Sequence, residues 1–277
     1  MNRFHHWVCS SAFWRAGLQK HILPWALEGV VLGDSVLEIG PGRGALTDLL
    51  VERAGRLVAI ELDRLLATEL RYKYSRCPNV EILEGDVLNI DFRTVLKRTV
   101  GPLSDLRPLK PSRAHVVGNL PYYITSDILL RLFDFHDQFD VMVIMAQREV
   151  AERVAAKPGS RDYGLLSATA QLYCKTELLF TLPPGAFSPP PKVHSSVLRL
   201  TVAPRFEELQ VAAKDFIPFL KKAFAMKRKT LLNNLKKDFP ESKIKAALKK
   251  VGARADVRAE ALALDKTAEV FRLLQQS

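Results

Sequence analysis

One stretch decides the fold of this 277-residue chain: Val36-Leu37-Glu38-Ile39-Gly40-Pro41-Gly42-Arg43-Gly44-Ala45-Leu46-Thr47. An apolar run leads to a carboxylate, then to alternating glycines, then to leucines at helical spacing. This order predicts a strand, a tight turn and a helix, which together form the first unit of an open α/β sheet. Glycines suit the turn because they adopt positive φ and let the backbone approach a ligand closely.

The charge beside the turn narrows the choice of ligand. A glycine turn before a helix often binds phosphate, and Gly40, Gly42 and Ala45 fit the relaxed dinucleotide fingerprint. However, Glu38 stands two residues before the first glycine, where its charge would repel a pyrophosphate. S-adenosylmethionine carries an ammonium and a sulfonium and has no phosphate. We therefore expect S-adenosylmethionine rather than NAD, with a turn that binds nothing as the alternative.

Composition excludes several classes of protein. The chain is 48% hydrophobic and 26% charged, as in ordinary folded proteins. No apolar run approaches the roughly 18 residues of a membrane helix, so we expect no membrane contact. Cys9, Cys77 and Cys174 are too few and too far apart for a disulfide framework or a zinc site. The six histidines form no ligand-spaced cluster. We expect no metal and a reducing, cytoplasmic location.

Positive charge is concentrated at the C-terminal end. The net charge of the chain is +11, and residues 204–277 hold 17 Lys/Arg against 9 Asp/Glu, a net of +8. This segment shows helical spacing, including a predicted helix over residues 229–237, and no strand signals after the boundary at Ala203-Pro204-Arg205. We expect a ligand-binding α/β domain over residues 1–203 and a basic helical domain over 204–277 that binds a polyanion. A merely solvated basic helix face is the alternative.

The N-terminal segment also lacks negative charge. Residues 1–27 contain no acid, and Arg3, Arg15 and Lys20 stand among serines and aromatics. This composition is typical of an organelle transit peptide and also of an arm that contacts RNA. We favour the arm, followed by a helix over residues 18–31.

Two further acids follow predicted strands. Glu61 ends an apolar run 21 residues after Gly40, the spacing at which an acid accepts hydrogen bonds from a ribose diol. Asp86 follows the next strand, where an acid can accept from the adenine amine; an ordinary turn aspartate is the alternative. The neighbouring apolar residues Leu62 and Val87 are assigned to the same cofactor site.

The fourth predicted strand stops at Asn119-Leu120-Pro121-Tyr122. A nucleobase amine is a poor nucleophile because its lone pair is delocalised into the ring. The Asn119 side chain and the Leu120 carbonyl can accept its two hydrogens and leave the lone pair directed at a methyl donor. Tyr122 offers a flat face for a base removed from its stack. A β-turn with a packing tyrosine is the alternative.

A proline-rich segment joins the last two predicted strands. Residues 183–193 include three consecutive prolines, which form a stiff extended segment rather than a strand. Phe187 is predicted to stack on the face of the base opposite Tyr122, with a structural aromatic as the alternative. Lys192 is predicted to meet a phosphate, as are Lys227, Arg228 and Lys229 in the basic segment.

The chain resembles the small-subunit rRNA adenine N6,N6-dimethyltransferases of the KsgA type. The resemblance runs from about residue 36 to residue 235 and rests on several motifs: Glu38-Ile39-Gly40-Pro41-Gly42, Ile60-Glu61-Leu62-Asp63, Gly118-Asn119-Leu120-Pro121-Tyr122, Gln147-Arg148-Glu149-Val150-Ala151-Glu152-Arg153, Phe187-Ser188-Pro189-Pro190-Pro191-Lys192-Val193 and Ala223-Phe224-Ala225-Met226-Lys227-Arg228-Lys229-Thr230-Leu231. Two positions depart from the family pattern. Ser11-Ala12-Phe13-Trp14 replaces a Gln-x-Phe-Leu motif, and His194 replaces an aspartate.

The resemblance implies a Rossmann-like class I methyltransferase sheet, mostly parallel with an antiparallel edge strand, and a small all-α C-terminal domain. It implies S-adenosylmethionine-dependent dimethylation of two adjacent adenosines in the 3′-terminal hairpin loop of 16S rRNA, on an assembling small subunit. We expect the chain to act as a monomer. By position, Gly40, Glu61, Asp86 and Asn119 match cofactor contacts, and Asn119, Tyr122 and Phe187 match the base pocket. Two alternatives remain: a large-subunit rRNA methyltransferase of the antibiotic-resistance type, and a silent RNA-binding assembly or transcription factor.

Overall fold

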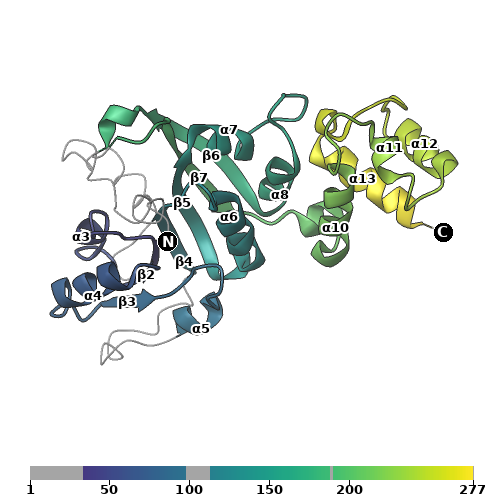
Figure 1. Cartoon of the computed structure of the whole chain (residues 1–277). Coiled ribbons are helices and arrows are strands. Elements are labelled where there is room, and N and C mark those ends of the chain that lie inside the picture. Colours follow the sequence, from purple (N-terminus) through teal and green to yellow (C-terminus); the bar gives the residue numbers. More distant parts are fainter. Residues whose placement is uncertain (1–33, 98–112, 188–189, 277) are drawn as a thin grey trace. The chain divides into compact units, whose positions relative to one another are not determined.

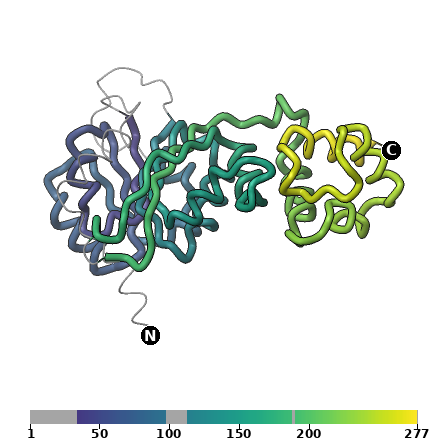
Figure 2. The backbone as a smooth tube through the Cα atoms, turned by 90° about the horizontal axis from the view of Figure 1, so that it is seen from above, coloured from purple at the N-terminus to yellow at the C-terminus, as the bar shows by residue number. Residues whose placement is uncertain are grey.

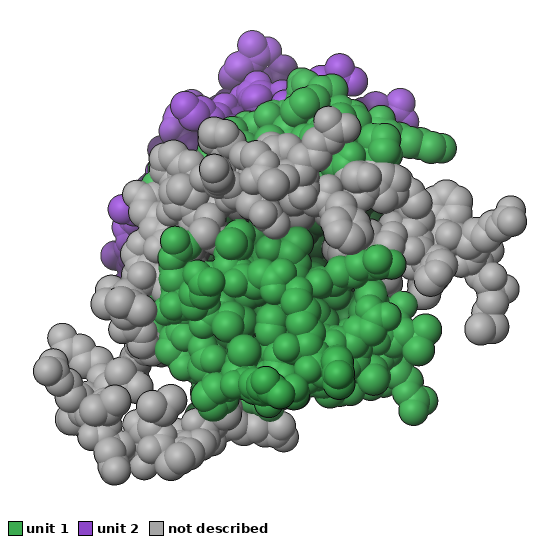
Figure 3. All heavy atoms as spheres, turned by 90° about the vertical axis from the view of Figure 1, so that its left-hand side faces the viewer, with its two compact units in different colours: residues 1–151, 177–202 green, residues 152–176, 203–277 purple. Residues whose placement is uncertain are grey.

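The fold is given by a computed structural model that describes residues 34–97, 113–187 and 190–276 (Figure 1). The acid-free segment over residues 1–27, the predicted helix over 18–31 and the Phe13 motif lie outside the described residues. Most of the polar segment over 97–113 lies outside them as well. The chain divides into two compact units, residues 1–151 with 177–202 and residues 152–176 with 203–277 (Figure 3).

The first unit is built on a seven-stranded sheet in the order β3-β2-β1-β4-β5-β7-β6. Strands β1 to β5 run parallel to one another, and β7 runs antiparallel to its neighbour β5. The predicted fold class, a mostly parallel Rossmann-like sheet with an antiparallel edge, is therefore confirmed. The strands are β1 Ser35–Ile39, β2 Arg56–Glu61, β3 Val80–Glu84, β4 Ala114–Asn119, β5 Phe139–Gln147, β6 Cys174–Leu182 and β7 Ser195–Val202.

The central strands read as near-continuous apolar runs because both faces of the sheet are covered. Val36, Leu57 and Val116 are fully buried. Helix α4 begins after Asp63, whose side chain accepts hydrogen bonds from the first-turn amides of Leu65 and Leu66, a typical N-cap. The helices of this part of the chain are α3 Thr47–Leu50, α4 Arg64–Lys73, α5 Phe92–Lys97, α6 Thr125–Asp134 and α7 Arg148–Val154.

The strand order reverses between β1 and β4. From β1 the chain builds outward through β2 and β3, and then returns to place β4 and β5 on the other side. Ligands of open α/β sheets bind at the carboxyl ends of the strands at such a reversal. Gly118 allows β4 to lie close to β1 there, since a Cβ at this position would be 3.0 Å from the Ile39 carbonyl oxygen. The sheet thus brings the glycine turn and the Asn119 corner to neighbouring strand ends.

The described residues of the second unit form helices and connecting loops, apart from 174–176, which begin strand β6. Its helices are α8 Leu165–Tyr173, α9 Phe206–Leu209, α10 Ala213–Ala223, α11 Leu231–Leu235, α12 Glu241–Lys250 and α13 Leu264–Gln275, and Figure 2 follows their backbone. Phe216, Phe219 and Phe271 form its aromatic core, with ring centroids of Phe271 5.3 Å and 5.1 Å from the other two. Contacts place Glu152–Thr176 in this unit. The functional division at residue 203 stays a prediction.

One predicted element is corrected. The pattern predicted a helix over residues 229–237, but Lys229 lies in a turn and α11 begins only at Leu231. The reason is local: Thr230 is the N-cap and accepts a hydrogen bond from the Asn233 amide at 3.2 Å. Asn234 then donates to the carbonyl oxygen of Ala223, at the end of α10, at 2.6 Å. The basic cluster Lys227-Arg228-Lys229 is therefore displayed on the turn between two helices.

Candidate active site

The glycine turn lies at the carboxyl end of β1. Gly40, Gly42 and Gly44 have φ values of +68°, +58° and +85°, a region that side-chain-bearing residues rarely adopt. The Gly40 amide donates to the Ile60 carbonyl oxygen at 3.0 Å, which ties the start of the turn to β2. A Cβ on Gly40 would lie 3.5 Å from the Asn119 carbonyl oxygen. The turn is thus adjacent to the end of β4, as the sequence predicted.

Glu61 links the turn to the end of β2. Its two carboxylate oxygens accept hydrogen bonds from the Gly42 amide and the Asp63 amide, each at 2.9 Å. The side chain is buried, and burial raises the pKa of Glu61 although these two hydrogen bonds oppose the rise. Each oxygen keeps a second lone pair, so the carboxylate can also accept from the two hydroxyls of a diol.

The end of β3 lies beside Glu61. The Gly85 amide donates to the Glu61 carbonyl oxygen at 2.9 Å. The next residue, Asp86, accepts from the Leu88 amide at 2.9 Å and from the Asn89 side chain at 3.0 Å. Val87 is buried, whereas Leu62 is 46% exposed and offers an apolar surface next to Glu61. The predicted cofactor residues on β1, β2 and β3 therefore lie at or just after the carboxyl-terminal ends of these strands.

The predicted base-binding corner follows β4. The Leu120 amide donates to the Met145 carbonyl oxygen at 3.0 Å, which fixes the corner on β5. The Tyr122 hydroxyl is 2.6 Å from the Ser195 hydroxyl at the start of β7. Burial raises the pKa of Tyr122. Within the described residues the Asn119 carboxamide, half-buried, has no side-chain hydrogen bond, and it is therefore available to a ligand.

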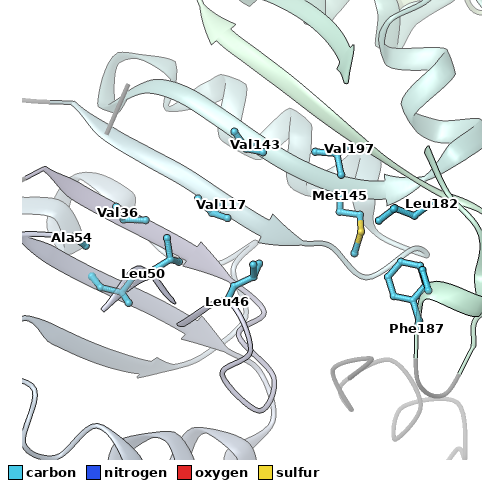
Figure 4. Close-up of a cluster of buried hydrophobic side chains, with 12 residues drawn as sticks. Val36, Leu46, Leu50, Ala54, Val117, Val143, Met145, Leu182, Phe187 and Val197 are labelled. Atoms are coloured by element: carbon cyan, nitrogen blue, oxygen red, sulfur yellow. The ribbon is translucent and has the colours of Figure 1, made fainter. Parts of the chain in front are cut away.

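Phe187 is buried, whereas stacking on a base requires an exposed face of its ring. It is 3% exposed and belongs to an apolar cluster in which it lies near Met145 and Leu182 (Figure 4). In this arrangement the ring acts as a structural aromatic. Stacking on a base stays a prediction, and it requires one face of the ring to be uncovered.

The predicted phosphate-binding residues are all exposed. Lys192 lies in the first unit, just before β7. Lys227, Arg228 and Lys229 lie on the turn of the second unit, where the Lys227 ammonium donates to the Arg161 carbonyl oxygen at 2.5 Å.

Glu38 is buried beneath the turn. The Thr47 hydroxyl donates to its carboxylate at 2.7 Å, and the side chain is 1% exposed. Burial raises the pKa of Glu38 to about 8, while the Thr47 hydrogen bond opposes the rise. Near neutral pH the ligand-free protein therefore holds a proton on Glu38.

We expect this proton to make stability depend on pH. The unfolded chain releases it near the ordinary value of 4.5, whereas the folded chain keeps it up to about 8. The folded state therefore binds more protons between pH 5 and 8, and the free energy of unfolding should fall as pH rises through that window. Glu38→Gln should flatten the slope in denaturant titrations at each pH. The exposed Glu52→Gln is the control and should keep the wild-type slope; an unchanged slope in Glu38→Gln would contradict the assignment.

The sequence patterns did not identify two residues whose hydroxyls restrain side chains of the site. Thr47 restrains Glu38, and Ser195 restrains Tyr122 from a position 73 residues away. A threonine in the first turn after the glycines offered a weak local signal for the first. No local pattern could have identified the second, because the contact exists only once β7 lies beside β5.

Comparison with known proteins identifies the family. A family model described as ribosomal RNA adenine dimethylase matches residues 28–276. The chain belongs to that family. This ribosomal RNA adenine dimethylase family member is 58% identical to the ribosomal RNA small subunit methyltransferase A of Koribacter versatilis over 249 residues, 88% of the chain and 87% of the relative. It is thus an rRNA-modifying methyltransferase, as the motifs predicted.

Solved structures agree with the fold. A dimethyladenosine transferase from Plasmodium falciparum matches with a TM-score of 0.73 and 24% identity, covering 93% of this chain and 94% of that one. The 23S rRNA methyltransferase ErmE matches with a TM-score of 0.68 and 24% identity, covering 95% and 100%. At this identity both likenesses concern the fold alone, and they do not separate the two subunits as substrates.

Two kinds of feature are absent from the described residues. No helix there is long and apolar enough to span a membrane. No group of three or more His, Cys, Asp or Glu side chains there is arranged to hold a metal ion.

Proposed function

We propose that the protein uses S-adenosylmethionine to dimethylate the N6 amines of two adjacent adenosines in the 3′-terminal hairpin loop of small-subunit rRNA. It does so in the cytoplasm as a monomer, on an assembling subunit. The observation that carries the proposal is the position of the Asn119 corner beside the glycine turn, at the point where the strand order reverses. The Asn119 carbonyl oxygen would lie 3.5 Å from a Cβ placed on Gly40. The small-subunit name of the Koribacter relative supports the choice of substrate.

The donor set fits this methyl donor. Glu61 and Asp86 supply acceptor oxygens, and Glu38 adds negative charge once a bound cation displaces its proton, whereas a pyrophosphate would need donors and positive charge. Glu61 and Asp86 would bind the adenosine, with Leu62 and Val87 against its ring. Glu38 and the turn of Gly40 and Gly42 would receive the methionine end. When bound, S-adenosylmethionine supplies an electrophilic methyl group.

The base corner activates the amine by orientation. The Asn119 side-chain oxygen and the Leu120 carbonyl accept the two amine hydrogens, which holds the nitrogen lone pair in line with the methyl carbon. The nitrogen–carbon bond forms as the carbon–sulfur bond breaks, and the resulting ammonium releases a proton to water without a strong base. Tyr122 supports one face of the flipped adenine, and Phe187, once uncovered, the other.

Basic residues outside the pocket hold the RNA. Lys192 on the first unit and Lys227, Arg228 and Lys229 on the second are exposed cations suited to phosphates. In this proposal residues 1–203 carry the chemistry and residues 204–277 retain the rRNA.

The test is mass spectrometry of small-subunit rRNA from cells with and without the protein. We expect dimethyladenosine in the 3′-terminal hairpin only when the protein is present, and the same product when purified protein acts on small-subunit particles. Modification of large-subunit RNA alone would favour the antibiotic-resistance type. Absence of S-adenosylmethionine binding in calorimetry would favour a silent RNA-binding factor. Either result would overturn the proposal.

A further inference from the structure

Three side chains meet beside Gly44, in the second half of the glycine turn, and have no part in the chemistry above. Tyr74, at the end of α4, places its hydroxyl oxygen 2.8 Å from an Asp48 carboxylate oxygen and 3.2 Å from the Gly44 carbonyl oxygen. The Lys73 ammonium is 2.8 Å from the other Asp48 oxygen. Asp48 lies on α3, the helix that the turn leads into. The cluster therefore joins α4 to the second half of the turn.

The phenol acts as a donor in this cluster. It has one hydrogen, and the nearer acceptor is the Asp48 carboxylate, which accepts more strongly than a neutral carbonyl. Burial and the Asp48 contact raise the pKa of Tyr74, so the hydroxyl keeps its proton at physiological pH. The Gly44 carbonyl also accepts from the Asp48 amide at 2.9 Å. Hydroxyl, carboxylate and turn carbonyl thus form one connected group.

The ring of Tyr74 is held firmly. It is 7% exposed and packs in an apolar cluster with Ala59, Leu70 and Ile82. A Cβ on Gly44 would lie 2.4 Å from the Tyr74 hydroxyl oxygen, so the turn contacts the phenol with no room for a side chain. Glu61 holds the first half of the turn through the Gly42 amide, and Tyr74 holds the second half through Asp48, whose own amide donates to the Gly44 carbonyl oxygen.

We infer that Tyr74 is a positioning residue for the methyl donor: through Asp48 and the Gly44 carbonyl, it holds the turn in the shape that receives the methionine end of S-adenosylmethionine. The inference rests on the proposed function. Tyr74 does not touch the reacting atoms, and its effect should appear in cofactor affinity rather than in turnover once the cofactor saturates the enzyme.

The experiment compares Tyr74→Phe with Tyr72→Phe in the full chain. Tyr74→Phe keeps the packed ring and removes only the hydroxyl, whereas Tyr72 is 86% exposed on the same helix and serves as the matched control. For Tyr74→Phe we expect the Kd by calorimetry and the KM for S-adenosylmethionine to rise about two- to tenfold, the range for one lost hydrogen bond, with kcat changed less than about twofold. Asp48→Asn should shift both constants in the same direction, and Tyr72→Phe neither.

The outcomes separate the inference from the proposed function. If Tyr74→Phe lowers the Tm but leaves Kd and KM at wild-type values, the role is structural and the inference fails alone. If kcat falls while KM is unchanged, the residue acts on the chemical step and the inference fails as well. If the wild-type chain itself gives no binding heat with S-adenosylmethionine, both the proposed function and the inference are overturned.

Discussion

Asn119→Ala is expected to lower kcat/KM for small-subunit rRNA by about 10²- to 10³-fold, the range for removing one preorganised polar group from a reacting centre. The carboxamide has no side-chain hydrogen bond within the described residues, so removing it takes a hydrogen bond away from no other group there. The Tm should therefore stay close to the wild-type value. Methyl transfer to rRNA from labelled S-adenosylmethionine measures the rate.

Asn119→Asp provides the matched variant. It keeps an acceptor oxygen at the same distance from the backbone, replaces the NH₂ group with a second oxygen and adds a negative charge. If acceptance from the amine is the function of Asn119, the aspartate should retain more activity than the alanine. A wild-type rate in Asn119→Ala would remove the basis of the proposed chemistry.

Glu61→Gln is expected to raise the Kd for S-adenosylmethionine by about 10- to 100-fold and to lower the free energy of unfolding by about 1–3 kcal/mol. Two amides, from Gly42 and Asp63, converge on the two carboxylate oxygens. A glutamine must present its NH₂ group to one of them, which sets a donor against a donor. Calorimetry and denaturant titration measure the two effects.

Glu84→Gln is the control for Glu61→Gln. Glu84 is the register partner of Glu61 on β3, and it is exposed and forms a surface pair with Arg71 at 3.5 Å. Such pairs contribute little to stability, so both quantities should stay near wild type. Equal Kd values for Glu61→Gln and Glu84→Gln would exclude Glu61 from the ribose site.

The sequence predicted the parts of the site that depend on local order. The apolar run before Gly40 and the carboxylate at Glu61 each follow from strand periodicity and spacing, and the sheet has both at the expected strand ends. Parallel strands bring their carboxyl ends to one edge, so the adjacency of the turn and Asn119 could be anticipated as well.

The remaining features depend on tertiary packing. The Tyr74–Asp48 contact joins residues 26 positions apart. Helical spacing from Ala67 and Leu70 places Tyr74 on the buried face of α4 and Tyr72 off it, but this spacing does not show which group the Tyr74 hydroxyl meets. Phe187 is buried because it packs with Met145 of β5 and Leu182 of β6, which only the folded sheet brings to it. The turn at Lys229 shows that a local signal can also be overlooked. The capping hydrogen bond of Thr230 starts the helix at Leu231, although helical spacing begins at Lys229.

Gly118 has a consequence for how enzymes of this design can diversify. Because it lets β4 lie directly against β1, the glycine turn and the Asn119 corner stand at the tips of adjacent strands, whose separation of about 4.8 Å is a constant of the β-sheet. Under the proposed function these tips receive the two reactants, so the backbone of the two strands would set the gap that the methyl group crosses. A new RNA target would then be acquired through the loops and the helical unit without a change in that gap.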